Sequence, residues 1–299
     1  MVGFASTFRQ RELGMIKDES IHELNTHIHR FKSQSQPHNS SLILAGTGPN
    51  GSGHVSTIAA LSLEFIEQLQ GVHVISGSIF SLMSCLAHRQ GVLNRDNFEN
   101  CDRKVRSIHQ ASVGNVVKHF VGKREKPRTL FDNERIRDTV TMLYGQDFVQ
   151  QPLSALAYPY RFYAYCSNQN KVMELSAKTF PDMTLAEAAM ATASVPFMHG
   201  QFTYRGMVLS DPIFCPLIKP FRKRMFSLPG NKLYVNHKRK GLFGSVYFIK
   251  AEERRFPELA MGLDFLAFNL GWSNRYVDNL HRRLVSDILA EESGRTGNT

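Results

Sequence analysis

Residues that could do chemistry gather in two short stretches, each directly after a predicted buried strand. The first is the glycine-rich loop Gly46–Gly51, which follows the apolar run Leu42–Ala45. Backbone N–H groups of such a loop can bind a pyrophosphate or stabilise the oxyanion of an ester-cleavage reaction. The second is the turn Ile75–Leu82, which follows the apolar run Val72–Ile75 and can present a nucleophile between a strand and a helix.

One interpretation of the glycine-rich loop is a dinucleotide site. The spacing Gly46-x-Gly48-x-x-Gly51 fits the dinucleotide-binding fingerprint. That fingerprint also needs an acidic residue about 20 positions further on, which binds the ribose hydroxyls. The second strand ends in Val74–Ser78 without an acid, and Ser52 stands where a phosphate-binding Walker A loop needs lysine. A dinucleotide-binding protein is therefore our third hypothesis.

Four segments, in chain order, resemble motifs of the patatin-like phospholipase family. Leu44–Gly51 resembles its Gly-Gly-Gly-x-Arg-Gly loop, and Val74–Ser81 resembles its Gly-x-Ser-x-Gly elbow with Gly77 at the first glycine. Leu185–Pro196 resembles Ala-Ser-x-Ala-x-Pro, and Tyr204–Pro212 lies where the family has Asp-Gly-Gly. The resemblance spans residues 41–216. It implies an α/β fold, a patatin-like three-layer α/β/α sandwich with a mainly parallel central sheet.

The resemblance also implies that the catalytic dyad is lost. Patatin-like enzymes use an elbow serine as nucleophile and an aspartate that takes its proton. Here the serine position is Ile79 and the aspartate position is Arg205. Ile79 has no polar atom, and Arg205 stays protonated at any ordinary pH. We therefore expect a catalytically degenerate protein related to lipid acyl hydrolases, which acts by binding a lipid, an acyl ligand or a protein partner.

Other positions of these motifs have changed as well. Thr47 replaces the middle glycine of the loop, Asn50 its arginine, and Ser81 the second glycine of the elbow. The remaining oxyanion-type loop would consist of Gly46, Thr47, Gly48, Asn50 and Gly51. The elbow frame would consist of Gly77 and Ser81.

An active phospholipase A-type lipid acyl hydrolase is the alternative. Ser78 directly precedes Ile79, and Asp211 lies six residues after Arg205, so a relocated Ser78–Asp211 pair could carry the reaction. An elbow presents one residue at its apex, however, and proton transfer needs hydrogen-bond contact. The structural interpretation makes Ser76 and Ser78 small packing residues and Asp211 a cap of the following turn.

The charge is strongly uneven. The 299 residues contain 36 Lys+Arg and 26 Asp+Glu, a net charge of +10. Eight cations lie between residues 219 and 240 without an acid: Lys219, Arg222, Lys223, Arg224, Lys232, Lys238, Arg239 and Lys240. Apolar side chains between them favour an anionic membrane surface as partner. Nucleic acid is less favoured because no nucleic-acid-binding motif accompanies the charge, and a solvated basic face is the remaining alternative.

Composition bounds the class of protein. A hydrophobic fraction of 42% and a mean hydropathy of -0.26 exclude a disordered chain, a fibre and a multi-span membrane protein. No apolar window reaches the ~20 residues of a spanning helix, and no secretory signal is visible. Four separated cysteines (Cys85, Cys101, Cys166 and Cys215) indicate reduced thiols. We expect a cytoplasmic protein, peripheral at a membrane where it binds one, with no metal and no cofactor.

The elements that must position these residues follow from apolar periodicity. We expect a leading helix and linker over 1–40, one domain over 41–290 with a basic and helical C-terminal part over 217–290, and a flexible tail over 291–299. Strands are predicted at Leu42–Ala45, Val72–Ile75, Phe202–Leu209 and Val246–Lys250, and a hairpin at Arg161–Ser167 and Lys171–Ser176. Helices are predicted at 11–33, 55–69, Phe80–His88, 257–290, and from the capping box Thr184–Glu187 through Ala193.

Overall fold

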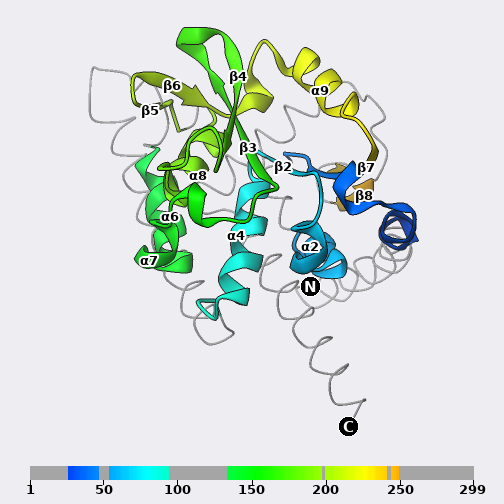
Figure 1. Cartoon of the computed structure of the whole chain (residues 1–299). Coiled ribbons are helices and arrows are strands. Elements are labelled where there is room, and N and C mark those ends of the chain that lie inside the picture. Colours follow the sequence, from blue (N-terminus) through cyan, green and yellow to red (C-terminus); the bar gives the residue numbers. More distant parts are fainter. Residues whose placement is uncertain (1–25, 47–53, 94–132, 197–198, 241–243, 249–299) are drawn as a thin grey trace, which may run out of the picture.

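The computed structural model describes residues 26–46, 54–93, 133–196, 199–240 and 244–248 (Figure 1). These residues form a mixed sheet with the strand order β5-β6-β3-β2-β1-β7-β8, and β4 pairs with β3 off this path. The strands are β1 (Ser40–Leu44), β2 (Gly71–Ile75), β3 (Tyr160–Cys166), β4 (Lys171–Ser176), β5 (Phe202–Tyr204), β6 (Met207–Ser210), β7 (Asn231–Lys240) and β8 (Gly244–Phe248).

The centre of the sheet is parallel. β1 pairs in parallel with β2 and β7, and β2 pairs in parallel with β3, whereas β4, β5, β6 and β8 pair antiparallel. All five residues of β1 and of β2 are buried. Strands covered on both faces favour continuous apolar runs such as Leu42–Ala45. Val72–Ile75 follows this pattern except at the buried His73. The α/β class expected from the sequence is confirmed.

Helices lie on both faces of the sheet. A helix over 26–34 precedes β1. The other helices are α2 (His54–Leu61), α3 (Leu63–Ile66), α4 (Ser78–Arg89), α6 (Glu134–Tyr144), α7 (Gln146–Val149), α8 (Leu185–Ala193) and α9 (Ile218–Phe226). Short 3-10 turns are η1 (Pro37–Asn39), η3 (Leu153–Ala155), η4 (Ser167–Gln169) and η5 (Pro212–Phe214). Figure 1 shows α9 on the opposite side of the sheet from α4 and α8.

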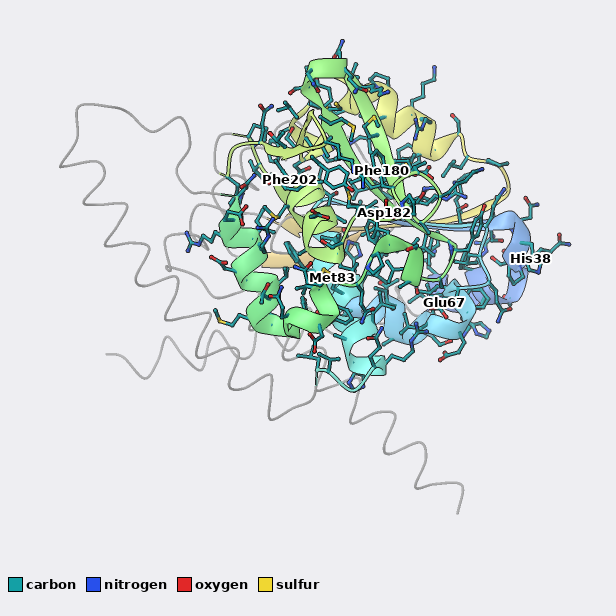
Figure 2. The ribbon with its side chains drawn as sticks, turned by 60° about the vertical axis from the view of Figure 1, so that its left-hand side comes forward. His38, Glu67, Met83, Phe180, Asp182 and Phe202 are labelled. Carbon is teal, nitrogen blue, oxygen red and sulfur yellow. The ribbon has the colours of Figure 1, made fainter. Side chains whose placement is uncertain are left out.

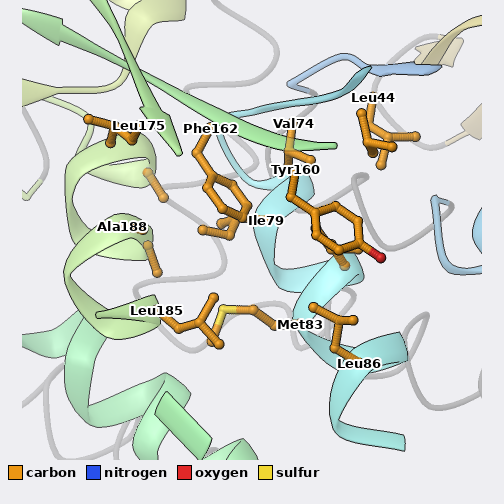
Figure 3. Close-up of a cluster of buried hydrophobic side chains, with 14 of the residues drawn as sticks. Leu44, Val74, Ile79, Met83, Leu86, Tyr160, Phe162, Leu175, Leu185 and Ala188 are labelled. Atoms are coloured by element: carbon orange, nitrogen blue, oxygen red, sulfur yellow. The ribbon is translucent and has the colours of Figure 1, made fainter. Parts of the chain in front are cut away.

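Two apolar clusters correspond to the two faces. The larger one joins Leu44, Val74 and Phe162 to side chains of α2, α4, α6 and α8 (Figure 3). The smaller one joins Ile43, Ile75 and Tyr163 to Ile213 of η5 and to Phe221 and Met225 of α9. Neighbouring strand residues point to opposite faces, which is why Leu44 and Ile43 belong to different clusters.

Several expected elements are confirmed. The hairpin of β3 and β4 pairs Cys166 with Lys171. α8 begins with the expected capping box, in which the Thr184 hydroxyl accepts from the Glu187 N–H and the Glu187 carboxylate accepts from the Thr184 N–H. The capping box can be predicted from the local sequence because its two hydrogen bonds join residues within the same short segment.

Two elements differ from the expectation. The helix expected over 55–69 is divided into α2 and α3 at Ser62, which has φ 66° and caps α3 with its side chain. The single strand expected over Phe202–Leu209 is a hairpin, because Arg205 and Gly206 both have positive φ and reverse the chain. The helix expected over 257–290, the tail over 291–299 and residues 11–25 of the leading helix lie outside the described residues.

Candidate active site

Ser76 occupies the apex of the turn between β2 and α4. β2 ends at Ile75, and α4 begins at Ser78 with Gly77 as its N-cap. Ser76 has φ 58°, a left-handed conformation that residues other than glycine seldom adopt. A serine held in a tight strand-to-helix turn is typical of a nucleophile elbow. The turn therefore presents Ser76, and the serine lies at the N-terminus of a twelve-residue helix.

The carboxylate of Asp211 lies directly against this serine. The Ser76 hydroxyl donates a hydrogen bond to Asp211 Oδ2, and Asp211 Oδ1 accepts one from the Ile213 N–H at 2.9 Å. The Asp211 N–H donates to the Ser194 carbonyl at 2.9 Å. Both the side chain and the backbone of Asp211 are thus fixed, with one carboxylate oxygen turned to the serine.

The register of β3 explains why residues so far apart meet. β4 occupies one edge of β3 along Arg161–Cys166, so β2 and β6 share the other edge. β2 pairs with β3 as far as Tyr163, and β6 pairs from Tyr165 in the opposite direction. The two strands therefore run toward each other, and the residues that follow them, Ser76 and Asp211, meet in the gap between.

The environment of Asp211 changes its proton affinity. Asp211 is fully buried, and burial raises its pKa to about 7, although the hydrogen bonds from Ser76 and Ile213 act in the opposite direction. Burial disfavours the charged carboxylate. A group with a pKa near neutral pH is well suited to take a proton and to return it.

Thr192 of α8 holds the elbow in place. Its hydroxyl accepts a hydrogen bond from the Ser76 N–H at 3.3 Å and donates one to the Tyr163 carbonyl. Thr192 is completely buried. The hydroxyl therefore links the apex of the turn to β3, the strand that also aligns β6.

Gly46 brings the start of the glycine-rich loop against the serine. A Cβ atom at this position would lie 2.6 Å from the Ser76 Cβ and 3.0 Å from the Ile75 carbonyl oxygen, so only glycine fits without movement. The carboxyl end of β1 and the apex of the elbow are thus in contact. The other expected loop residues, Thr47, Gly48, Asn50 and Gly51, lie outside the described residues.

Ser78 bonds to the end of β1 and not to Asp211, its partner in the expected relocated pair. Its hydroxyl donates to the Ala45 carbonyl at 2.7 Å, and His54 Nε2 lies 2.9 Å from the same oxygen. Burial lowers the pKa of His54 to about 4, so this ring is neutral. The structure therefore pairs Asp211 with Ser76 and uses Ser78 to hold the end of β1 against α4.

Ile79 belongs to the apolar core. It lies in the first turn of α4, is completely buried, and packs in the cluster that contains Val74 and Phe162 (Figure 3). Ser81, the other expected frame residue, is also buried in α4. Ser76, the residue at the apex of the turn, lies three residues before Ile79. The Ile79 side chain is therefore not at the position of a nucleophile.

Arg205 lies at the tip of the β5–β6 hairpin. Its guanidinium forms an ion pair with Asp182 at 3.2 Å, and both side chains are largely exposed. The centroid of the adjacent Tyr204 ring lies 6.1 Å from that of Phe180 and 6.3 Å from that of Phe202. Phe180, Asp182 and Phe202 are labelled in Figure 2. Arg205 therefore lies away from Ser76, and the carboxylate that contacts Ser76 belongs to Asp211, six residues later.

The expected basic segment is described in part. Lys219, Arg222, Lys223 and Arg224 are exposed on α9. The side chains of Lys238, Arg239 and Lys240 lie outside the described residues, although their backbone forms the end of β7.

Three further features concern the described residues alone. They contain no group of three or more His, Cys, Asp or Glu residues that could hold a metal ion. No disulfide joins Cys85, Cys166 and Cys215, which are all buried there. No helix in this part of the chain is both long enough and apolar enough to cross a bilayer.

Comparisons with known proteins add no assignment. No protein-family model matches the chain, and a search of curated proteins gave no match. The geometry around Ser76 and Asp211 therefore carries the functional argument.

Sequence reasoning missed Ser76 because it aligned Gly77 with the first glycine of the family's elbow. A local signal was present nonetheless. Ser76 is the first residue after the apolar run Val72–Ile75 and is followed by the small residues Gly77 and Ser78. Small neighbours allow the sharp turn that places the first residue after the strand at the apex.

Proposed function

We propose that this chain is a serine acyl hydrolase of the patatin-like type, with Ser76 as nucleophile and Asp211 as general base. The observation that carries the proposal is the hydrogen bond from the Ser76 hydroxyl to the buried Asp211 carboxylate, at a strand-to-helix turn with positive φ. A nucleophile and a base in direct hydrogen-bond contact are the minimum for covalent acyl transfer.

The proposed reaction has two steps. The Ser76 oxygen attacks the ester carbonyl while its proton passes to Asp211 Oδ2, and the alcohol leaves with that proton. Water then attacks the acyl-serine, gives its proton to Asp211, and the serine oxygen recovers it as the carboxylic acid departs. At the start of α4, the Ile79 and Phe80 N–H groups already donate to the Ser76 and Gly77 carbonyls. The Gly77 and Ser78 N–H groups, which precede them, are suited to stabilise the oxyanion, together with the loop that begins at Gly46.

The substrate class and the finer fold rest on the resemblance. The order β1, glycine-rich loop, α2, β2, elbow and α4 agrees with a patatin-like sandwich, and the helices on both faces of a sheet with a parallel centre support it. The corresponding substrate is a carboxylic ester of a lipid, cleaved in the manner of a phospholipase A.

A binding protein without turnover is the second candidate, and one observation favours it. Ser76 is 1% exposed and Asp211 is 0% exposed. An ester reaches the hydroxyl only when the atoms that cover it move. If these atoms never move, no ester reaches Ser76 and Asp211, and the protein acts only by binding partners at its surface.

Active-site labelling separates the two candidates. The full chain is treated with an alkyl fluorophosphonate, with and without phospholipid micelles, and the labelled peptide is identified by mass spectrometry. Turnover of short acyl esters and of phospholipid is measured in parallel. We expect labelling of Ser76, and turnover that disappears in Ser76→Ala.

The matched control is Ser78→Ala, the same chemical change two residues away. We expect it to keep the labelling of Ser76, because Ser78 bonds to the Ala45 carbonyl and not to Asp211. Turnover that survives in Ser76→Ala, or an absence of labelling in every condition by a folded protein, would contradict the hydrolase proposal.

A further inference from the structure

One face of α9 carries three cations and an exposed aromatic ring. Lys219, Arg222, Lys223 and Phe226 follow one another at positions i, i+3, i+4 and i+7, and such residues lie on one side of a helix. All four are exposed. Phe226 is 45% exposed, an unusual state for a large apolar side chain in the described part of the chain. We call these four residues the α9 basic face.

The opposite side of α9 fixes its orientation. Phe221 and Met225 are buried against the sheet, and the Phe221 ring lies 5.1 Å from the Tyr163 ring. Figure 1 shows α9 at the periphery of the molecule, away from α4, α6 and α8. Because the apolar side is anchored in the core, the α9 basic face must point outward.

Among the described residues, no acid forms an ion pair with the α9 basic face. The sequence has no Asp or Glu from Pro212 to Ala251. Within the described residues, every ion pair joins side chains other than Lys219, Arg222 and Lys223. The cations are thus available to an external anion, and the potential of neighbouring like charges raises its local concentration.

Phe226 distinguishes a lipid surface from a purely ionic partner. The centroid of its ring lies 4.8 Å from the centroid of the Tyr234 ring. Tyr234 therefore covers one side of the Phe226 ring, and the other side is open to solvent. A half-exposed aromatic ring on the same side of a helix as several cations is suited to the bilayer interface, where phosphate groups meet acyl chains. The cations bind headgroup phosphates, while the ring enters the boundary beneath them.

We infer that the α9 basic face binds the surface of an anionic phospholipid bilayer. This inference goes beyond the proposed hydrolase, because binding needs neither Ser76 nor Asp211. It adds a spatial consequence, since η5 connects Asp211 to α9 within a few residues. A membrane bound at α9 therefore lies near the segment that carries the catalytic carboxylate.

Vesicle sedimentation of the full chain tests the inference. The Ser76→Ala protein is used so that lipid cleavage cannot alter the vesicles, with phosphatidylcholine alone or phosphatidylcholine mixed with phosphatidylserine, across a salt series. We expect binding to the mixed vesicles that weakens as salt increases. Changing Lys219, Arg222 and Lys223 to Gln should lower the partition coefficient on the order of 100-fold.

The matched control removes three other exposed cations. Lys32→Gln, Lys171→Gln and Lys178→Gln cause the same loss of net charge on other elements and should leave most of the binding. Phe226→Ser should weaken binding to the mixed vesicles without changing its salt dependence. Thermal unfolding of each variant confirms that the protein is folded.

Three results would overturn the inference. One is equal binding to neutral and anionic vesicles. Another is equal loss in the α9 and control triple variants. The third is stronger binding of a duplex DNA or single-stranded RNA oligonucleotide than of mixed vesicles at the same salt, which would make nucleic acid the partner of this face.

Discussion

Ser76 and Asp211 each have a property that packing alone does not require. Ser76 keeps a left-handed backbone that costs about 1–3 kcal/mol in a residue other than glycine. The Asp211 carboxylate is buried, and within the described part of the chain it bonds to the uncharged Ser76 hydroxyl and Ile213 N–H and forms no ion pair. Backbone strain and buried carboxylates of this kind are concentrated at functional sites. They support the proposal that Ser76 is a nucleophile and Asp211 its base.

The first prediction concerns the pH dependence of ester hydrolysis. Asp211 must be ionised to take the serine proton, and burial raises its pKa to about 7. We expect kcat/KM to rise with pH through about 7 and then to level off. Asp211→Asn should lower kcat/KM roughly 10³-fold and remove this dependence. Initial rates with an uncharged ester over a pH series measure both, and a flat profile in the wild-type protein would contradict the role of Asp211.

The same carboxyl affects stability with a defined sign. Its folded-state pKa lies above the ordinary value of 3.8, so the folded protein holds this proton more tightly than the unfolded chain. The stability contributed by Asp211 is therefore present below about pH 4 and lost as the pH rises to about 7. Asp211→Asn should raise the unfolding temperature relative to wild type at alkaline pH and not at acidic pH, which thermal denaturation at the two pH values tests.

At the scale of elements, α8 positions the elbow through one hydroxyl. Thr192→Val keeps the shape of the side chain but leaves the Ser76 N–H without its acceptor, at a cost of about 1–3 kcal/mol. We expect kcat to fall while KM changes little, because the nucleophile is misplaced and binding is not. Thr192→Ser restores the hydroxyl and should recover kcat. If Thr192→Ser is impaired and Thr192→Val is not, methyl packing and not positioning explains the residue.

The β5–β6 hairpin provides a test of the alignment that assigned the acid to Arg205. Arg205 and Gly206 both have positive φ, a turn in which asparagine followed by glycine is favoured. Arg205→Asn loses an exposed ion pair with Asp182 and a cation–π contact with the Tyr204 ring at 5.2 Å, and each contributes little at an exposed site. We expect unchanged hydrolysis and equal or higher thermal stability. A strong loss of turnover in a folded Arg205→Asn protein would show that this position, and not Asp211 alone, contributes to hydrolysis.

At the scale of the whole molecule, two buried histidines predict sensitivity to acid. Burial lowers the pKa of His54 to about 4 and that of His73 to about 3. Both stay neutral in the folded protein and take up protons on unfolding. Their contribution to stability is complete above the ordinary histidine value of 6.5 and declines as the pH falls toward these folded-state values.

His54→Gln isolates one of the two groups. Its amide can still donate to the Ala45 carbonyl, as His54 Nε2 does, but does not titrate. Chemical denaturation over an acidic pH series should show a smaller loss of unfolding free energy in His54→Gln than in wild type. An identical loss in both proteins would mean that His54 is not a source of the acid sensitivity.

Local pattern was sufficient for much of the fold. The apolar runs at Leu42–Ala45 and Val72–Ile75, the capping box of α8 and the β3–β4 hairpin are all determined by neighbours in the chain. It failed where one backbone angle changes the outcome. Ser62 divides a helix and Arg205 reverses a strand, because each has a positive φ. Neither serine nor arginine favours this conformation, so the residue type does not predict it.

The sequence by itself determined an α/β fold, the position of a tight turn after β2 and a basic segment at residues 219–240. Tertiary structure decided which side chains act together. Ser76 and Asp211 are 135 positions apart, and they meet because β2 and β6 share one edge of β3 and run toward each other. Ile79 lies in the core, in the first turn of α4, and Arg205 lies at the tip of the β5–β6 hairpin. Periodicity specifies which face of an element is buried, whereas strand register and turn geometry specify which polar side chains come into contact.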